Sequence, residues 1–166
     1  QIRGIIVLKG LSSLLTPELL KVLCEMGHGD EIVLADANFP AASLNSRVIR
    51  LDAHAGTDVL QAIMSVFPLD TYADCNAILM EVVPGDSVET SIWEAYEGIM
   101  EASEPGCLRM GHIERFAFYD RTARAYAVVA TGESALYANL ILKKGIVLGQ
   151  GSQSNCLNSK GASAQF

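Results

Sequence analysis

A histidine stands between two glycines in the stretch Met26-Gly27-His28-Gly29, directly before an apolar segment. The glycines carry no side chains, so the backbone is free to turn and the imidazole of His28 stays accessible. An imidazole titrates near neutral pH, and a position just after a helix favours its protonated form. His28 is therefore a candidate proton donor. The alternative is that it only binds the last carbonyls of the preceding helix.

A carboxylate, Asp36, stands at the far end of the same apolar segment (residues 32–35) and is followed by Asn38 and Pro40. Asp36 either forms a turn or binds a ligand, and the spacing is compatible with both roles. If the segment is an extended strand, His28 and Asp36 lie roughly 20 Å apart. A site that uses both then requires a bend or a neighbouring subunit.

A third group of polar side chains consists of Tyr119, Tyr137 and Asn139. Tyr137 and Asn139 precede an apolar segment and are two residues apart, so in an extended chain they point the same way. A phenol beside an amide suits the hydroxyl groups of a sugar. The alternative is an ordinary strand start whose polar side chains face water. In an extended chain, Arg115 points to the side opposite the neighbouring phenylalanines. The alternative is that it is a solvated surface charge.

Metal and nucleotide sites are not indicated. His28, Asp30, Asp36, His54 and His112 carry possible ligand atoms, but no HxH, HxxxH or HExxH spacing occurs among them. The glycines around His28 do not begin a dinucleotide motif, because a strand follows where a phosphate-binding loop requires a helix. We therefore expect no metal and no cofactor.

Strands alternate with helices along the chain. Thr16-Pro17-Glu18 is a typical helix start, with a hydroxyl cap, a first-turn proline and an acid, and Pro68 marks the end of a second helix. Apolar spacing predicts helices at 17–26, 58–67 and 92–102 and strands at 32–35, 77–83, 114–119, 126–130 and 140–142. This alternation predicts an α/β fold, a single domain with a mixed β-sheet flanked by helices.

The 166 residues fit one domain, and we expect it to span residues 8–148. Residues 1–7 are predicted to be an N-terminal extension. Residues 149–166 are rich in Gly, Ser, Asn and Gln without a hydrophobic period, which predicts a flexible tail.

Charge and cysteine usage limit the partners and the compartment. The formal net charge is −7, so a nucleic acid or an acidic membrane surface is not an expected partner. No apolar run approaches the ~18 residues of a membrane span. The four cysteines, Cys24, Cys75, Cys107 and Cys156, form no CxxC pair, and we expect core thiols in a reducing, cytoplasmic compartment.

Several segments together resemble the fucose mutarotases, relatives of the bacterial ribose pyranases. The segments are LLTPELLKVLCEMGHGDEIVLADANFP, FPLDTYADCNAILMEVVPGD, IERFAFYDRTARAYAVVATGE and ALYANLILKKGIV. The resemblance covers about Leu8 to Val147 and implies the ribose pyranase/fucose mutarotase-like fold. Departures include residues 51–55, where the usual Arg-Ala-Asp-Gly is replaced.

The resemblance also implies roles for individual residues. His28 matches the catalytic histidine of that family. The implied substrate-binding residues are Asp36, Asp70, Met80, Arg115, Tyr119, Tyr137 and Asn139. Members assemble into homo-oligomeric rings, up to decamers, with sites at subunit boundaries, which would bring His28 and Asp36 of different subunits together.

The implied activity is interconversion of the α- and β-anomers of L-fucose by acid/base-assisted ring opening and closure, without a cofactor. One alternative is a ribose pyranase that acts on D-ribose. Another is a ring protein that binds sugar without turnover. The aromatic segment FAFY and Met80 favour fucose over ribose.

Overall fold

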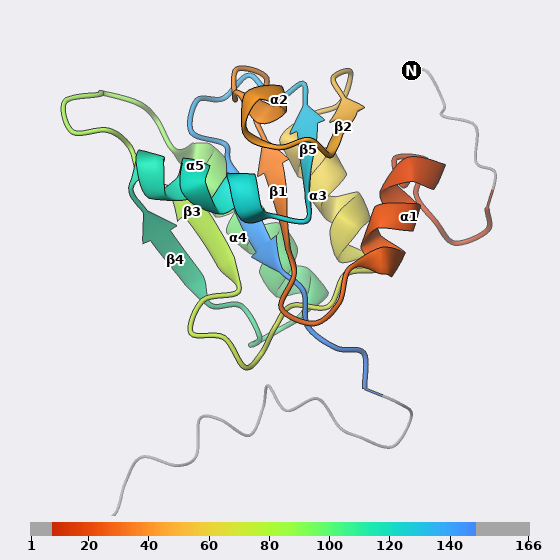
Figure 1. Ribbon diagram of the computed structural model, residues 1–166. Coiled ribbons are helices and arrows are strands. Elements are labelled where there is room, and N and C mark those ends of the chain that lie inside the picture. Colours follow the sequence, from red (N-terminus) through yellow and green to blue (C-terminus); the bar gives the residue numbers. More distant parts are fainter. Residues whose placement is uncertain (1–7, 149–166) are drawn as a thin grey trace, which may run out of the picture.

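A six-stranded sheet in the order β2-β5-β1-β6-β3-β4 organises the protein, and the computed structural model describes residues 8–148 (Figure 1). The strands are β1 (Glu31–Ala35), β2 (Val48–Leu51), β3 (Ala77–Met80), β4 (Met110–Ile113), β5 (Ala127–Thr131) and β6 (Leu140–Lys143). The helices are α1 (Pro17–Glu25), α2 (Ala41–Leu44), α3 (Gly56–Met64), α4 (Ser91–Ser103) and α5 (Arg115–Arg124). The extension expected at 1–7 and the tail expected at 149–166 lie outside the described residues.

The sheet is mixed, as predicted, because one central strand runs against the others. Strand β1 is parallel to β5 and antiparallel to β6, and β6 is also antiparallel to β3. The outer strands β2 and β4 are parallel to β5 and β3. The carboxyl ends of β1 and β3 and the amino end of β6 therefore meet at one edge, the upper edge in Figure 1. Open α/β sheets bind ligands at this kind of edge.

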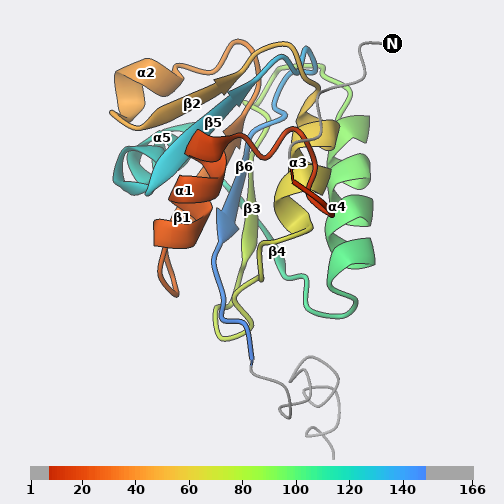
Figure 2. The ribbon, with the colours of Figure 1, turned by 90° about the vertical axis from the view of Figure 1, so that its right-hand side faces the viewer.

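Alternating strand residues face two separate helix layers. Leu34 of β1 belongs to a cluster that includes side chains of α1, α3 and α4. Val33, its neighbour, belongs to a second cluster with Ala41 of α2 and Phe118 of α5. Figure 2 shows α3 and α4 on one side of the sheet and α2 and α5 on the other. Each face is apolar, which explains why the central strands read as continuous hydrophobic runs.

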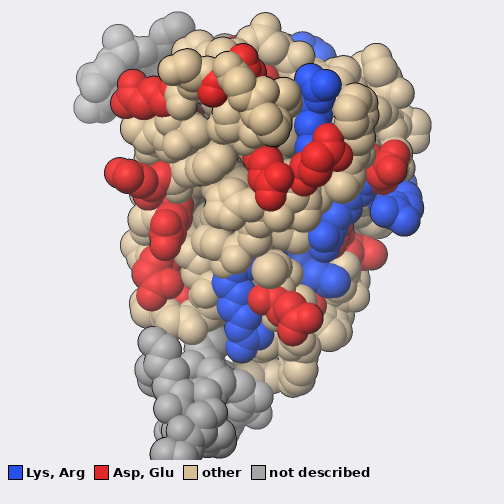
Figure 3. All heavy atoms as spheres, turned by 90° about the vertical axis from the view of Figure 1, so that its left-hand side faces the viewer, with Lys and Arg blue, Asp and Glu red and all other residues tan. Residues whose placement is uncertain are grey.

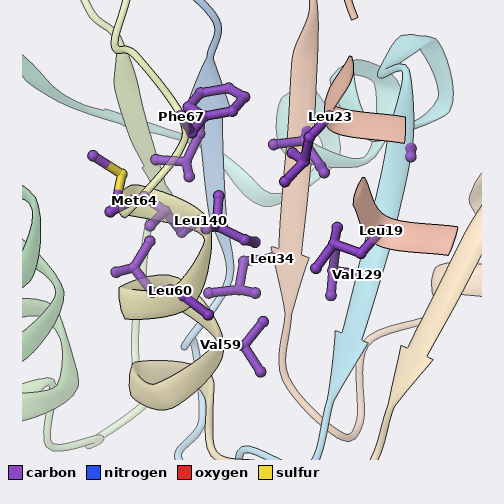
Figure 4. Packing of buried hydrophobic residues seen from close by; sticks show 14 of the residues in the cluster. Leu19, Leu23, Leu34, Val59, Leu60, Met64, Phe67, Val129 and Leu140 are labelled. Carbon is purple, nitrogen blue, oxygen red and sulfur yellow. The ribbon is translucent and has the colours of Figure 1, made fainter. Parts of the chain in front are cut away.

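The larger cluster fills the space between the sheet and the helices α1 and α3. Figure 4 shows Leu19 and Leu23 of α1 beside Leu34 and Val129 of the sheet, with Leu60 of α3 next to them. Burying a leucine side chain stabilises a fold by about 1.5–3 kcal/mol, so this layer fixes α1 and α3 relative to β1. It thereby fixes the segments that precede and follow β1.

The predicted start of α1 is confirmed. The Thr16 Oγ1 accepts a hydrogen bond from the backbone amide of Leu19 at 3.2 Å, and Pro17 is the first helical residue. Met26 caps the other end. The helix thus ends just before the glycines around His28.

The strand predicted at 114–119 is wrong, because this segment begins helix α5. The Glu114 carboxylate accepts hydrogen bonds from the amides of Phe116 and Ala117, which makes it a helix cap. Phe118 is buried while Phe116 is 62% exposed, so the two phenylalanines do not share the environment that alternation assumed. The hydroxyl of Thr122, one turn after Phe118, donates to its carbonyl.

Other elements were missed or have different limits. The edge strands β2 and β4 and the single-turn α2 are short, and β4 carries Gly111 and the exposed His112 instead of an apolar run. The strand predicted at 77–83 ends at Met80, and the helix predicted at 58–67 spans residues 56–64. These differences lie at element ends and sheet edges, where local pattern is weakest.

Two glycine substitutions should change stability in opposite directions. A Cβ at Gly132 would overlap the backbone carbonyl of Asp52, so we expect Gly132→Ala to destabilise the fold by about 1–3 kcal/mol. Gly98 lies exposed inside α4 with open space around its Cβ position, so Gly98→Ala should stabilise it by about 1 kcal/mol. Thermal unfolding followed by far-UV circular dichroism tests both, and equal Tm shifts of the two variants would contradict this account.

Candidate functional site

A cavity of about 210 Å³ opens at the edge where β1 and β3 end and β6 begins. Its lining comes from the ends of these strands, the segment after β1, helix α5 and the loops before α4 and β6. The lining residues are Asp36, Asn38, Phe39, Pro40, Met80, Asp86, Tyr119, Leu136, Tyr137 and Asn139. Polar and apolar side chains converge here, as small-molecule sites require.

A reciprocal hydrogen-bonded pair joins Asp36 to Asn139 at the back of this cavity. The Asn139 Nδ2 donates to Asp36 Oδ2 at 2.8 Å, and the Asp36 amide donates to Asn139 Oδ1 at 2.9 Å. Both residues are buried, and they are adjacent because β1 pairs with β6. Burial raises the pKa of Asp36 above its ordinary value, although hydrogen bonds from the Asn38 amide, from Asn139 and from the Phe39 amide act against this. The pair holds a carboxylate with enhanced proton affinity toward the cavity.

Tyr137 reaches the cavity from a turn and not from a strand. Its φ is +58°, in the left-handed region that side-chain-bearing residues rarely adopt. The Trp93 Nε1 donates to the Tyr137 carbonyl at 2.9 Å, and the phenol donates to Asp86 Oδ2 at 2.5 Å. Tyr137 and Asn139 therefore line one cavity, as expected, but period-2 alternation was the wrong reason.

An apolar wall completes the cavity. Met80 lies at the carboxyl end of β3 and is nearly fully buried. The rings of Phe39 and Tyr119 meet edge to face with centroids 5.6 Å apart, and Phe39 packs in the same way on Phe118. The wall fixes the position of the Tyr119 ring, whose hydroxyl is the polar tip of an otherwise apolar surface.

His28 lies at the opposite edge of the sheet, where it pairs with Asp70. The distance from His28 Nε2 to Asp70 Oδ1 is 3.1 Å, and the imidazole is 46% exposed while the Asp70 side chain is 5% exposed. The Tyr72 ring meets the imidazole edge to face, with the ring centroids 5.7 Å apart. An ionised carboxylate only accepts hydrogen bonds, so Nε2 carries a proton toward Asp70 and Nδ1 remains for other partners.

The helix-capping alternative for His28 does not hold. The ammonium group of Lys144 donates to the carbonyl oxygens of Leu23 and Met26, both at 2.6 Å, and so takes the capping position at the end of α1. The Gly29 amide donates to the Lys144 carbonyl at 2.8 Å. These contacts leave the His28 imidazole with Asp70 as its hydrogen-bonding partner within residues 8–148.

The free energy of unfolding at acidic pH should depend on the His28–Asp70 pair. Burial alone would raise the pKa of Asp70, but hydrogen bonds from the Tyr72 amide and His28 and the charge of Lys143 bring it below its ordinary 3.8. The unfolded chain then binds more protons, so this stabilisation is present above pH 3.8 and is lost as pH falls through the lowered pKa. We expect Asp70→Asn to be less stable than wild type at pH 5.

The difference should shrink steadily as the pH falls below 3.8. Urea unfolding of both proteins, from about pH 5 to about pH 2.5, measures this difference in the free energy of unfolding. A difference that grew on acidification would contradict the pairing.

The structure divides the sequence-predicted residues between the two sheet edges. Five residues line the cavity together: Asp36, Met80, Tyr119, Tyr137 and Asn139. His28 and Asp70 lie at the other edge, with the whole length of β1 between His28 and Asp36. One chain therefore does not bring its own imidazole to its own cavity.

Arg115 stands beside the cavity instead of lining it. It is the first residue of α5, directly after β4, and its guanidinium lies over the Phe116 ring at 4.9 Å. Its buried Nε has no hydrogen-bond partner within the described part of the chain. The hydrogen bond to Asp86 raises the pKa of the Tyr137 phenol above its ordinary value, and the charge of Arg115 acts against this rise. Arg115 is thus half-buried near the site and not the freely solvated charge that was the alternative.

Sequence reasoning missed five lining residues: Asn38, Phe39, Pro40, Asp86 and Leu136. Asn38 and Phe39 belong to the turn after β1, and a turn that follows a buried strand was a usable signal. Asp86 follows Pro84-Gly85, which indicated a turn but gave no hint of which element it faces. Leu136 carried no signal at all.

The remaining features agree with a small-molecule site. Figure 3 shows acidic and basic side chains lying among each other on the face beside β4, not gathered into a basic surface. Within residues 8–148, no three His, Cys, Asp or Glu side chains gather as metal ligands would. No helix in that range is long and apolar enough to cross a membrane.

Comparisons with known proteins agree with the resemblance seen in the sequence. Fucose mutarotase from Homo sapiens is 50% identical over 86% of this chain and 96% of its own. The structure of FucU from Bifidobacterium longum is 55% identical over 84% of this chain and all of its own, with a TM-score of 0.81. Fucose mutarotase from Streptococcus pneumoniae, in complex with L-fucose, is 46% identical over 85% of this chain and all of its own, also with a TM-score of 0.81. Residues 9–147 match the model of the RbsD / FucU transport protein family, and the chain therefore belongs to that family.

Proposed function

We propose that the protein is an L-fucose mutarotase that interconverts the α- and β-anomers of L-fucose. The observation that carries this proposal is the close match, over nearly the whole domain, to the Streptococcus pneumoniae mutarotase solved with L-fucose. The cavity supports it, because its carboxylate, amide and phenol groups suit sugar hydroxyls and its apolar wall suits the methyl group of a 6-deoxysugar.

Anomer exchange requires two proton transfers, together with breaking and re-forming the bond between C1 and the ring oxygen. An acid protonates the ring oxygen while a base removes the proton of the anomeric hydroxyl, and the ring opens to the aldehyde. Rotation about the bond between C1 and C2 exposes the other aldehyde face, and ring closure reverses both transfers. No electron, phosphate or acyl group moves, so side chains alone suffice for this chemistry.

His28 is the proton donor in this proposal. Its Nε2 is engaged with the buried Asp70, which orients the ring and leaves Nδ1 for a bound sugar. In its protonated form the imidazole donates to the sugar ring oxygen through Nδ1 while Nε2 keeps its contact with Asp70. Asp70 therefore acts through His28 and holds its ring in place.

The cavity residues bind the sugar. Asp36, Tyr137 and Asn139 fix its hydroxyl groups, and Met80 and Tyr119 contact its less polar side. The raised pKa of Asp36, caused first by burial, suits a group that accepts a proton during the reaction. Arg115 adds a positive charge beside the same hydroxyl-binding wall.

The complete site is formed by two subunits. His28 and the cavity lie at opposite sheet edges, roughly 20 Å apart along β1, so the imidazole of one chain serves the cavity of its neighbour. Such a head-to-tail contact closes into a ring when every subunit uses it. We propose a homo-oligomeric ring, up to a decamer, located in the cytoplasm.

Exchange NMR of the anomeric protons tests this function. Catalytic amounts of the protein should speed the exchange between α- and β-L-fucose well beyond its uncatalysed rate, and should do so less for D-ribose. Binding of fucose without faster exchange would instead identify a sugar-binding ring protein. Faster pyranose–furanose exchange of D-ribose than anomer exchange of fucose would identify a ribose pyranase.

A further inference from the structure

The turn before α4 holds the phenol of Tyr137 from two sides. The Asp86 amide donates to the Val83 carbonyl at 3.0 Å, and Gly85 adopts a φ of +95°, which closes a tight turn over Pro84. The Val83 amide donates to the Tyr137 hydroxyl oxygen at 3.4 Å, and the hydroxyl donates to Asp86 Oδ2 at 2.5 Å. This turn lies in the long β3–α4 connection, the loop at the upper left of Figure 1.

The arrangement determines what the phenol can offer to a ligand. A tyrosine hydroxyl has one proton and two lone pairs, and its proton is directed to Asp86. One lone pair faces the Val83 amide, so the remaining one is free to accept a hydrogen bond. Asp86 lines the cavity too, and its carboxylate also only accepts. The Tyr137–Asp86 pair therefore presents acceptors, and a sugar hydroxyl in contact with it acts as the donor.

The backbone conformation of Tyr137 indicates that surrounding contacts hold this residue in place. Within residues 8–148, Tyr137 is the one residue other than glycine with a positive φ. Strained backbone of this kind persists where surrounding contacts hold it, and it concentrates at ligand sites. Here the Trp93 indole holds the Tyr137 carbonyl and Asp86 holds the opposite end, the hydroxyl.

We propose that Asp86 is a positioning residue for sugar binding, which fixes the Tyr137 phenol and directs its proton away from the ligand. This inference rests on the proposed mutarotase function. Asp86 acts on substrate affinity and not on proton transfer at C1, because its partner is Tyr137 and not the His28 imidazole. Its loss should therefore change KM much more than kcat.

Saturation kinetics of fucose anomer exchange on the assembled protein test the assignment. Asp86→Ala should raise KM about tenfold, the effect of losing one charge-assisted hydrogen bond, with kcat changed less than about threefold. Asp86→Asn keeps an acceptor for the phenol and should raise KM by less. Glu89→Gln removes a charge from the same connection outside the cavity and should behave as wild type.

A double-mutant cycle separates positioning from a general structural role. In a Tyr137→Phe background, where the phenol is absent, Asp86→Ala should raise KM by less than about twofold. An undiminished effect of Asp86→Ala in that background, or wild-type KM in both Asp86 variants, would overturn the inference while leaving the proposed function in place. Absence of exchange catalysis by the wild-type protein would overturn the proposed function itself.

Discussion

Replacing His28 with alanine should lower kcat for fucose anomer exchange by about 10²–10⁴-fold, the usual contribution of one positioned acid. The loss should fall on kcat because we propose that the imidazole transfers the proton and that the cavity at the other sheet edge binds the sugar hydroxyls. The fold should persist, because the side chain is 46% exposed and α1 is capped by Lys144. Exchange NMR over a range of fucose concentrations measures kcat and KM.

A matched control for this experiment is His54→Gln. His54 also lies in a loop and is half-buried, whereas His28 is exposed; it follows β2 and lies outside both the cavity and the His28–Asp70 pair. It should retain wild-type kinetics. Normal anomer exchange by a folded His28→Ala protein would refute the proposed mechanism, since no other imidazole is positioned to replace it at the Asp70 pair.

Mixing two inactive variants should restore activity. His28→Ala keeps an intact cavity, and Asp36→Asn keeps an intact imidazole. A subunit boundary that combines this cavity with this imidazole therefore has a complete site. If the two chains assemble at random in equal amounts, roughly a quarter of the boundaries contain both intact halves, and activity should recover to about that fraction. Each variant alone should stay near the background rate.

Co-expression of differently tagged chains, followed by tandem purification and exchange NMR, measures this recovery. The control mixes His28→Ala with the double variant His28→Ala/Asp36→Asn, which supplies no intact imidazole and should restore nothing. Recovery in the first mixture requires the site to span two subunits. If mixed assemblies form but remain inactive, His28 and Asp36 do not act across a boundary, and the two-subunit site is wrong.

The local elements of the protein follow from short-range patterns in the sequence. The Thr16-Pro17 start of α1 and the apolar strand β1 are visible in a few consecutive residues, because a cap or a buried strand depends on its own neighbours. The prediction for residues 114–119 was wrong because it too considered only neighbouring residues. Alternating phenylalanines imitate a strand, and the Glu114 cap and the packing of Phe118 against the sheet decided for a helix.

The site residues were recognisable by type and by family resemblance, but their grouping was not. Asp36 and Asn139 are 103 positions apart and touch because β6 pairs with β1. His28 and Asp70 pair because β1 and β3 start at the same edge. Asp86 gave no signal, since a turn residue does not reveal which distant side chain it will face.

The sequence by itself determined the α/β class, the central strands, the first helix and the family, because hydrophobic period, caps and matched segments are local properties of the chain. The tertiary structure alone decided which polar side chains meet. Strand order placed the polar side chains of the cavity at one edge of the sheet and the imidazole of His28 at the other. Pairing between distant strands is a long-range choice that no short window of residues contains.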